Sequence, residues 1–235
     1  MTIGTCGLTF QGVAERVPFL RALSPQQLAL IQPFAQIRQF RAGQPVFALG
    51  EPSHEYLFLV AGHIKLLRRY GDGREVILDI RAPGDLICAG AVTAVAPYCC
   101  SSVALDKDIT IVALPRRDLS RLFDDNPSIG QLFSREAAHH EMRMADRVFE
   151  IARGHVEQRV GAALLRLADR IGESQPDGSL LIQLRLSRQD LADLCGTTLE
   201  SAIRTMVHLG RENIIQTVAG GFVVTNRGRL ARLAK

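Results

Sequence analysis

The side chains of Glu200 and Arg204 are the ones whose chemistry is easiest to interpret. They lie four residues apart in a segment patterned as a short helix. A glutamate can accept a hydrogen bond from cytosine N4, and an arginine can donate two to guanine O6 and N7. Leu199 and Ile203 lie beside them and could contact a thymine methyl group. The set is suited to reading base edges in DNA, although an ordinary Glu200–Arg204 ion pair on a surface helix has the same spacing.

The residues around this pair, 187–212, predict a helix-turn-helix. The spacings Ser187–Asp190 and Thr197–Glu200 each match a capping box, which marks two helix starts close together, and Gly196 supplies the turn between them. We expect the DNA contacts to come from Ser187, Arg188, Thr197, Thr198, Leu199, Glu200, Ser201, Ile203 and Arg204.

The segment that follows predicts the wing of a winged helix. Short apolar pieces at 214–215 and 222–224 flank the Gly220–Gly221 pair, as in two strands joined by a glycine turn. A tail with Arg227, Arg229, Arg232 and Lys235 adds positive charge on this side. Double-stranded DNA is therefore the expected partner.

The bulk composition is that of a soluble globular protein. The chain has 235 residues and a formal net charge of +4, and it has no apolar run long enough to cross a membrane and no secretory leader. The 5 cysteines are an odd number and argue for reduced thiols rather than a disulfide scaffold. We therefore expect a cytoplasmic protein without membrane association.

The first half has the pattern of an antiparallel β-roll. From about residue 34 to 115, short apolar pieces alternate with glycines, and Gly71–Gly73 is the clearest hairpin turn. The period then changes to that of helices, with a short helix near 117–123 and a long one up to about 153. The predicted fold is α+β, with a sensor roll at 1–126, a long dimerisation helix at 127–153 and a winged helix-turn-helix at 154–235.

The long helix carries apolar residues at alternating spacings of four and three, which is typical of a coiled-coil seam. We expect this seam to pair two copies of the chain, because a paired helix-turn-helix reads two half-sites. Packing of the helix on its own roll is the alternative. The expected interface consists of Phe133, Ala137, His140, Met144, Arg147, Val148 and Ile151.

The order of roll, long helix and winged helix-turn-helix resembles the superfamily of the cyclic-AMP receptor protein and the fumarate and nitrate reduction regulator. The resemblance rests on the glycine pattern, Gly84-Asp85, Asn126-Pro127 and the string RQDLADLCGTTLESAIR. It implies a homodimeric transcription factor that contacts RNA polymerase. It also implies that Glu200 and Arg204 read the TGA core of each half-site.

Two departures from the cyclic-AMP type concern the DNA site and the effector site. Leu199 stands where that type has an arginine, and GTTLESAIR is closer to the anaerobic and nitrogen-oxide-responsive branch of the superfamily. That resemblance implies a TTGAT-like half-site, while Ile203 leaves the outer base open. By resemblance, Ala89 replaces the glutamate that binds the ribose, and Cys99 and Cys100 replace the arginine and serine that bind the phosphate. Losing that arginine removes a bidentate contact, so cyclic AMP is not the expected effector.

The effector region instead offers thiols and imidazoles. Cys88, Cys99 and Cys100 could form a thiol sensor or soft-metal site, or could simply fill space as small apolar side chains. His54, His63 and His140 are candidate haem ligands. An iron-sulfur cluster is not expected, because Cys6 is the only cysteine near the N-terminus. The effector-pocket candidates are Cys88, Ala89, Cys99, Cys100, Ser101, His140 and Met144.

Other functions have less support in the sequence. No nucleophile elbow, Walker loop or Rossmann glycine run is present, so an enzyme is not expected. A thiol-based redox enzyme using Cys99 and Cys100 is conceivable, although adjacent cysteines are poor disulfide partners. A DNA-binding regulator that responds to no effector is the remaining alternative.

Overall fold

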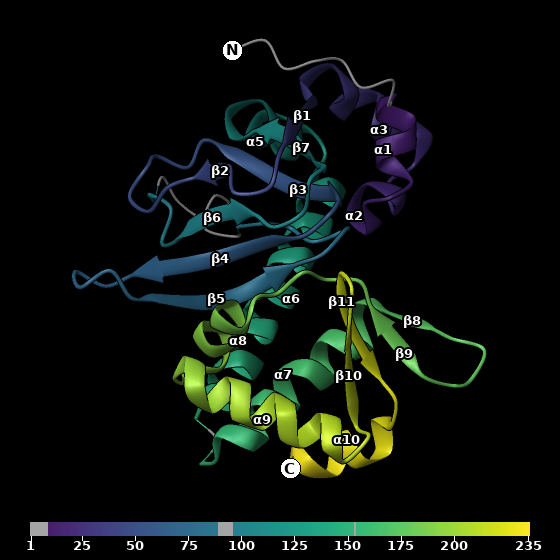
Figure 1. The fold of residues 1–235 in the computed structure, drawn as a ribbon. Helices are drawn as coiled ribbons and strands as arrows, with labels where there is room; N and C mark the ends of the chain where they lie inside the picture. The colour runs from purple at the N-terminus through teal and green to yellow at the C-terminus, as the bar shows by residue number, and fades with distance from the viewer. Residues whose placement is uncertain (1–8, 89–95, 153) are drawn as a thin grey trace. The chain divides into compact units, whose positions relative to one another are not determined.

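The computed structural model describes residues 9–88, 96–152 and 154–235. The chain forms two compact units, one with residues up to 68 and 80–144, the other with residues 69–79 and 145–235 (Figure 1). Among the described residues, no helix has the length and apolar character that crossing a membrane requires.

The strands of the first half form two sheets with the orders β1-β7-β3 and β2-β6-β4-β5. The pairs β1–β7, β3–β7, β2–β6 and β4–β6 are antiparallel, so the predicted antiparallel roll is confirmed. The strands are β1 (Gln36–Phe40), β2 (Pro45–Phe47), β3 (Glu55–Ala61), β4 (Ile64–Arg69), β5 (Glu75–Arg81), β6 (Ser101–Ala104) and β7 (Ile109–Pro115).

The turn between β4 and β5 forms where the glycines predict it. Gly73 has a φ of +86°, a left-handed conformation that glycine adopts without the steric cost of a Cβ. The Tyr70 N–H donates to the Arg74 carbonyl at 2.8 Å, which closes the hairpin. This turn belongs to the second compact unit.

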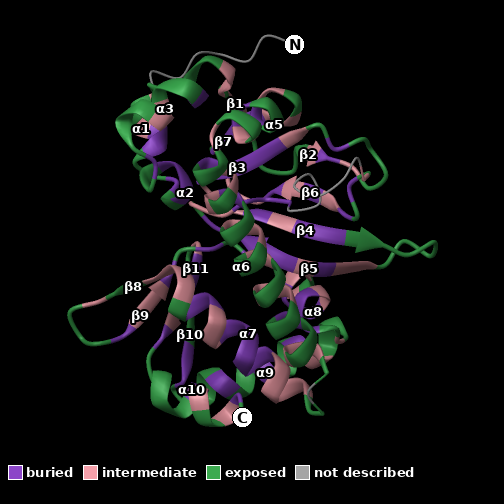
Figure 2. Cartoon of the chain, turned by 180° about the vertical axis from the view of Figure 1, so that it is seen from behind, coloured by how far each residue is buried: buried purple, intermediate pink, exposed green. Residues whose placement is uncertain are grey.

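Aromatic side chains form the core of the first unit. Phe19 stacks on Phe58 with ring centroids 5.3 Å apart, and Phe133 packs edge-on against Phe19 at 4.1 Å. The core residues of β3 are buried on both of its faces (Figure 2). The helices of this region are α1 (Phe10–Ala14), α2 (Pro18–Arg21), α3 (Pro25–Ile31), the 3-10 helix η1 (Gln32–Phe34), α5 (Arg116–Asp125) and the first part of α6 (Pro127–Ile151).

The second unit has the helices and strands of a winged helix-turn-helix. Its antiparallel sheet has the order β10-β11-β9-β8, and Gly220 turns between β10 and β11 at a φ of +92°. The predicted wing strands are therefore confirmed. The elements are α7 (Val156–Ile171), β8 (Gly172–Ser174), β9 (Leu180–Ile182), α8 (Arg188–Cys195), α9 (Leu199–Arg211), β10 (Ile215–Val218), β11 (Gly221–Val224) and α10 (Arg227–Leu233).

The long helix α6 corrects the expected dimer interface. Phe133 is 1% exposed and Arg147 is 2% exposed within a single chain. Their side chains are covered by their own chain, which removes both from that interface, because the spacing of apolar residues does not distinguish burial within a chain from burial between chains. Val148 is 67% exposed. The other members of the set are half-buried: Ala137, His140, Met144 and Ile151.

Candidate DNA-reading surface and thiol cluster

The first helix of the helix-turn-helix, α8, begins and ends at the residues that the sequence predicts. The Ser187 hydroxyl accepts from the Asp190 N–H at 2.9 Å, and the Asp190 carboxylate accepts from the Ser187 N–H at 3.0 Å. This reciprocal pair is a capping box. Gly196 ends the helix in a left-handed conformation with a φ of +58°.

The second helix, α9, begins one residue later than predicted. Thr198 is its N-cap, and the Thr198 hydroxyl accepts from the Ser201 N–H at 3.2 Å. The predicted capping box between Thr197 and Glu200 is therefore wrong. Each of the two adjacent threonines was a possible N-cap. The Thr197 N–H donates to the Ala192 carbonyl oxygen at 3.0 Å, so it is not available for a capping box, and Thr198 is the N-cap.

The two sides of α9 differ sharply in exposure. Its inner side is buried and consists of Ala202, Thr205, Met206 and Leu209. On the outer side, Leu199 is 41% exposed and Ile203 is 42% exposed, although both are apolar. Glu200 and Arg204 are exposed beside them, and no ion pair joins these two described residues. Their hydrogen-bonding atoms are therefore available to a partner.

Four of the expected DNA contacts already use their side chains for interactions inside the protein: Ser187, Arg188, Thr198 and Ser201. Ser187 caps α8, as described above. Arg188 donates to Thr217 Oγ1 at 2.8 Å, and its guanidinium carbon lies 5.6 Å from the centre of the Phe222 ring. Partial burial lowers the Arg188 pKa below its usual value. Arg188 therefore attaches α8 to the wing, and direct DNA contact by it remains a prediction.

A buried ion-pair network, which the sequence analysis missed, supports α8 from within the second unit. Arg147 donates to the carbonyl oxygen of Leu194, in the last turn of α8, at 2.8 Å, and to that of Leu78 at 3.1 Å. Arg166 pairs with Asp79 at 3.1 Å and with Glu150 at 3.0 Å. The network thus connects α6, α7 and the end of the β4–β5 hairpin to the helix-turn-helix.

Burial makes this network energetically important. Asp79 is 1% exposed, and desolvation lowers the Arg166 pKa in spite of the carboxylates beside it. A single aspartate inside the apolar run of β5 is the sequence signal that pointed to this network, because a buried charge requires a partner.

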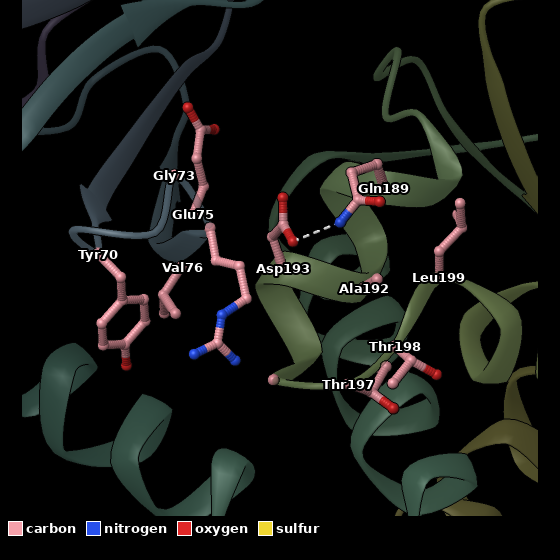
Figure 3. Close-up of a pocket in the computed structure, with 12 residues that line it drawn as sticks. Tyr70, Gly73, Glu75, Val76, Gln189, Ala192, Asp193, Thr197, Thr198 and Leu199 are labelled. Carbon is pink, nitrogen blue, oxygen red and sulfur yellow. Dashed lines mark hydrogen bonds between the residues drawn. The ribbon is translucent and has the colours of Figure 1, made fainter.

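A hollow of about 900 Å³ lies on the second unit between the hairpin turn and the helix-turn-helix. Figure 3 shows Tyr70, Glu75 and Val76 on one side of it and α8 on the other, where Gln189 donates to Asp193 at 2.7 Å. Three expected DNA contacts also line it: Thr197, Thr198 and Leu199. A molecule that fills this hollow would cover these three residues.

The three cysteines of the effector region form one cluster. Cys88 is 6% exposed, Cys100 is 2% exposed and Cys99 is exposed, and all three are free thiols. The Cys99 sulfur accepts hydrogen bonds from the side chains of Cys100 and Cys88, and these bonds lower its pKa. The hydrogen bond to Cys99 and burial raise the Cys100 pKa. The cluster therefore favours a thiolate at Cys99.

A buried arginine lies near this cluster and contacts α6. Arg81 is fully buried and its Nη2 lies 2.8 Å from Nδ1 of His140, and its charge acts on Cys100. Sequence analysis did not single out Arg81. Of the other effector-pocket candidates, Ser101 accepts from the Leu49 N–H at 3.0 Å. Met144 is half-buried on α6, and Ala89 lies outside the described residues.

The histidines proposed as haem ligands have different interaction partners. His63 pairs with Asp106 at 2.7 Å, and His140 is held by Arg81. His54 uses its carbonyl oxygen to accept from the Arg116 N–H at 2.8 Å. In the described part of the chain, no three histidine, cysteine or acidic side chains are arranged to hold a metal ion.

Both halves of the chain match known domain families. The Crp-like helix-turn-helix domain matches residues 158–233, and the cyclic nucleotide-binding domain matches residues 37–126. The CRP-like cAMP-activated global transcriptional regulator of Mycobacterium tuberculosis is 26% identical over 223 residues, which cover 95% of this chain and 99% of that protein. The nitrogen fixation regulation protein FixK of Bradyrhizobium diazoefficiens is 24% identical over 195 residues, covering 83% and 80%.

A solved structure shows the same fold. The structure of FixK2 from Bradyrhizobium japonicum matches with a TM-score of 0.75 and 22% sequence identity, covering 86% of this chain and 98% of that one. The roll, the long helix and the helix-turn-helix thus occur here in the order that the matching domains and relatives share. The chain belongs to the CRP/FNR family and is a DNA-binding transcription regulator.

Proposed function

We propose that the protein acts as a homodimer on a palindromic DNA site with TTGAT-like half-sites. The observation that carries this proposal is the outer side of α9, where Glu200 and Arg204 are exposed between Leu199 and Ile203 over a buried inner side. Glutamate suits cytosine, arginine suits guanine, and the two apolar side chains suit thymine methyl groups. Two such helices, about one helical turn of DNA apart, would read both half-sites.

The exposed side of α6 supports the dimer. Met142 and Phe149 are each 67% exposed, and they lie seven residues apart. With the exposed Ala138 and Ala145, they give spacings of four, three and four, which is a heptad seam. We propose this seam in place of the one expected from the sequence, and of the earlier set Val148, at 67% exposed, lies beside it.

Phe149→Glu tests the dimer. A charge at a buried seam position on each of two helices opposes pairing, so we expect a monomer by light scattering at a concentration where the wild type is a dimer. Glu141→Gln, at an exposed position of the same helix, is the control. An unchanged dimer in Phe149→Glu would contradict the proposed seam.

The proposed signal is not a cyclic nucleotide. The domain match supports the type of roll, whereas activation by cyclic AMP is a property of the Mycobacterium tuberculosis relative and is not carried over to this chain. In this chain, Cys99 and Cys100 occupy the positions at which the family resemblance places the phosphate-binding arginine and serine. The different interaction partners of the histidines favour a thiol signal over haem. Calorimetry should show no cyclic AMP binding at micromolar concentrations.

DNA binding itself is tested with the reduced protein. We expect retention of a duplex that contains two TTGAT-like half-sites at a concentration where a shuffled duplex of equal length remains free, measured at one stated salt concentration. Equal binding to both duplexes would contradict sequence-specific reading. Contact with RNA polymerase and the absence of catalysis are part of the same proposal and follow from the family of regulators.

A further inference from the structure

The backbone segments that carry the three clustered cysteines are each held by a hydrogen bond to another part of the roll. Ile87, next to Cys88, donates its N–H to the Leu57 carbonyl of β3 at 2.7 Å. Tyr98, next to Cys99, donates to the Glu51 carbonyl at 2.8 Å. Because both segments are held by the roll, the contact between the Cys88 and Cys99 side chains is a property of the fold.

The exposure of the thiols distinguishes their roles. Only Cys99 of the three is exposed, so a small solute in water reaches that sulfur first. Cys88 and Cys100 are buried and both donate hydrogen bonds to it. Cys100 is adjacent in sequence, and adjacent cysteines meet disulfide geometry poorly, whereas Cys88 comes from a separate segment. Cys88 is therefore the suitable partner for a disulfide.

The surroundings favour the anionic sulfur that such chemistry requires. A thiolate, not a thiol, attacks peroxides and disulfides. Cys99 receives two hydrogen bonds, and they lower its pKa. The fully buried Arg81 adds a positive charge near the cluster, and its guanidinium contacts His140 of α6.

We infer that Cys99 and Cys88 form a reversible thiol switch that responds to hydroperoxides. The Cys99 thiolate attacks the peroxide O–O bond, which gives a sulfenic acid on Cys99 and releases hydroxide when the oxidant is hydrogen peroxide. The Cys88 thiol then attacks the Cys99 sulfur, forming the disulfide and releasing water. In total, two thiols and one hydrogen peroxide give one disulfide and two waters, and a dithiol reductant reverses the change.

The consequence for regulation rests on the DNA-binding function proposed above. Oxidation removes the Cys99 anion, on which the charge of His140 on α6 acts, and Arg81 contacts His140. We expect this change to alter the affinity for the palindromic duplex by at least about fivefold, the lower end of ordinary allosteric coupling. The disulfide chemistry does not depend on DNA.

Mass spectrometry tests the chemistry in the full-length reduced protein. Hydrogen peroxide is added in equal amount, free thiols are blocked, and chymotryptic cleavage after Tyr98 separates Cys88 from Cys99. We expect a Cys88–Cys99 cross-linked peptide in the wild type and in Cys100→Ser, and none in Cys99→Ser. In Cys88→Ser, Cys99 should stop at the sulfenic acid and be captured by dimedone. A Cys99–Cys100 disulfide in the wild type, or a cross-link to Cys88 that is lost in Cys100→Ser, would overturn the assignment.

The buried Cys195 is an internal control, because it is 2% exposed and should remain a free thiol under the same treatment. Its oxidation together with Cys99 would indicate unfolding, which circular dichroism checks for each variant. The DNA measurement separates the two proposals. Binding by the reduced protein tests the DNA function alone, whereas reduced and oxidised protein with equal affinity would contradict the switch and leave the DNA function intact.

Discussion

The proposed DNA-reading surface, which is the exposed outer side of α9, and the thiol cluster differ in how buried residues support exposed ones. In the second unit, Glu200 and Arg204 extend from a helix whose opposite side is packed, and the charges beneath that region are paired. In the first unit, Cys99 is the exposed member of its cluster and its buried neighbours donate hydrogen bonds to it. A base reader needs a rigid base and free hydrogen-bonding atoms, whereas a sensing thiol needs neighbours that stabilise its anion.

Breaking the buried ion-pair network that supports α8 should have the largest effect, and this effect is on the free energy of unfolding. Asp79→Ala leaves Arg166 without one of its carboxylates, and breaking a buried ion pair costs about 3–5 kcal/mol. We expect a loss near the lower end, about 3 kcal/mol of unfolding free energy by urea denaturation, because Glu150 still pairs with Arg166.

Asp72→Ala is the matched control on the same hairpin. Asp72 pairs with Arg74 at 2.7 Å, but the Asp72 side chain is 52% exposed, so solvent already screens the pair. Its removal should leave the urea midpoint unchanged within error. Equal destabilisation by the two substitutions would show that the buried Asp79 network contributes no more to stability than the exposed Asp72–Arg74 pair. It would contradict the proposed role of the network in supporting the helix-turn-helix.

The pH dependence of alkylation tests the support of the Cys99 anion. Since hydrogen bonds lower the Cys99 pKa, its thiolate should persist as the pH falls below the usual thiol range near 8.5. Burial raises the Cys195 pKa to about 12, so that thiol stays protonated. At pH 6, iodoacetamide should modify Cys99 roughly a hundredfold faster than Cys195, with peptide mapping as the readout. A Cys99 rate that falls tenfold per pH unit from pH 8 to pH 6 would contradict the lowered pKa.

The sequence predicted the helix-turn-helix and the exposed side of α9 well because their determinants are local. Gly196, the Ser187 cap and the apolar stripe of α9 lie within one short segment, so their spacing alone predicts two helices and an exposed side. The error at Thr198 has a local cause too, since two adjacent threonines offer equivalent caps and only the backbone geometry selects one.

The buried contacts that support the helix-turn-helix and the thiol cluster could not be predicted from local patterns, because they join residues that are distant in sequence. Asp79 meets Arg166 across 87 positions, and Arg81 meets His140 across 59. The pattern of α6 predicted a helix, but it did not indicate that Phe133 belongs to the core of the roll. Patterns of apolar residues predict which side of a helix is buried better than they predict what buries it.

Loss of a base reader should weaken DNA binding without weakening the fold. Arg204→Ala removes a fork suited to guanine and should cost about 1–3 kcal/mol of binding free energy for the intact palindrome. The loss should shrink on a duplex in which that guanine is replaced. Arg211→Ala, at an exposed position near the end of the same helix, is the control and should weaken both duplexes equally or not at all. An equal loss on both duplexes for Arg204→Ala would make it a phosphate contact.

The smallest effect is expected for the N-cap of α9, which lies beside the residues proposed to read DNA. Thr198→Ala removes the hydroxyl that accepts from the Ser201 N–H, and loss of such a cap typically costs about 1 kcal/mol. Thermal unfolding without DNA measures this cost separately from any phosphate contact. Thr197→Ala is the control. Because Thr197 precedes the N-cap, its substitution should reduce stability less than the substitution of Thr198. If Thr197→Ala were the more destabilising change, α9 would begin where the sequence pattern predicted. The Glu200 side chain would then take part in a capping box with Thr197 and would be less available to DNA.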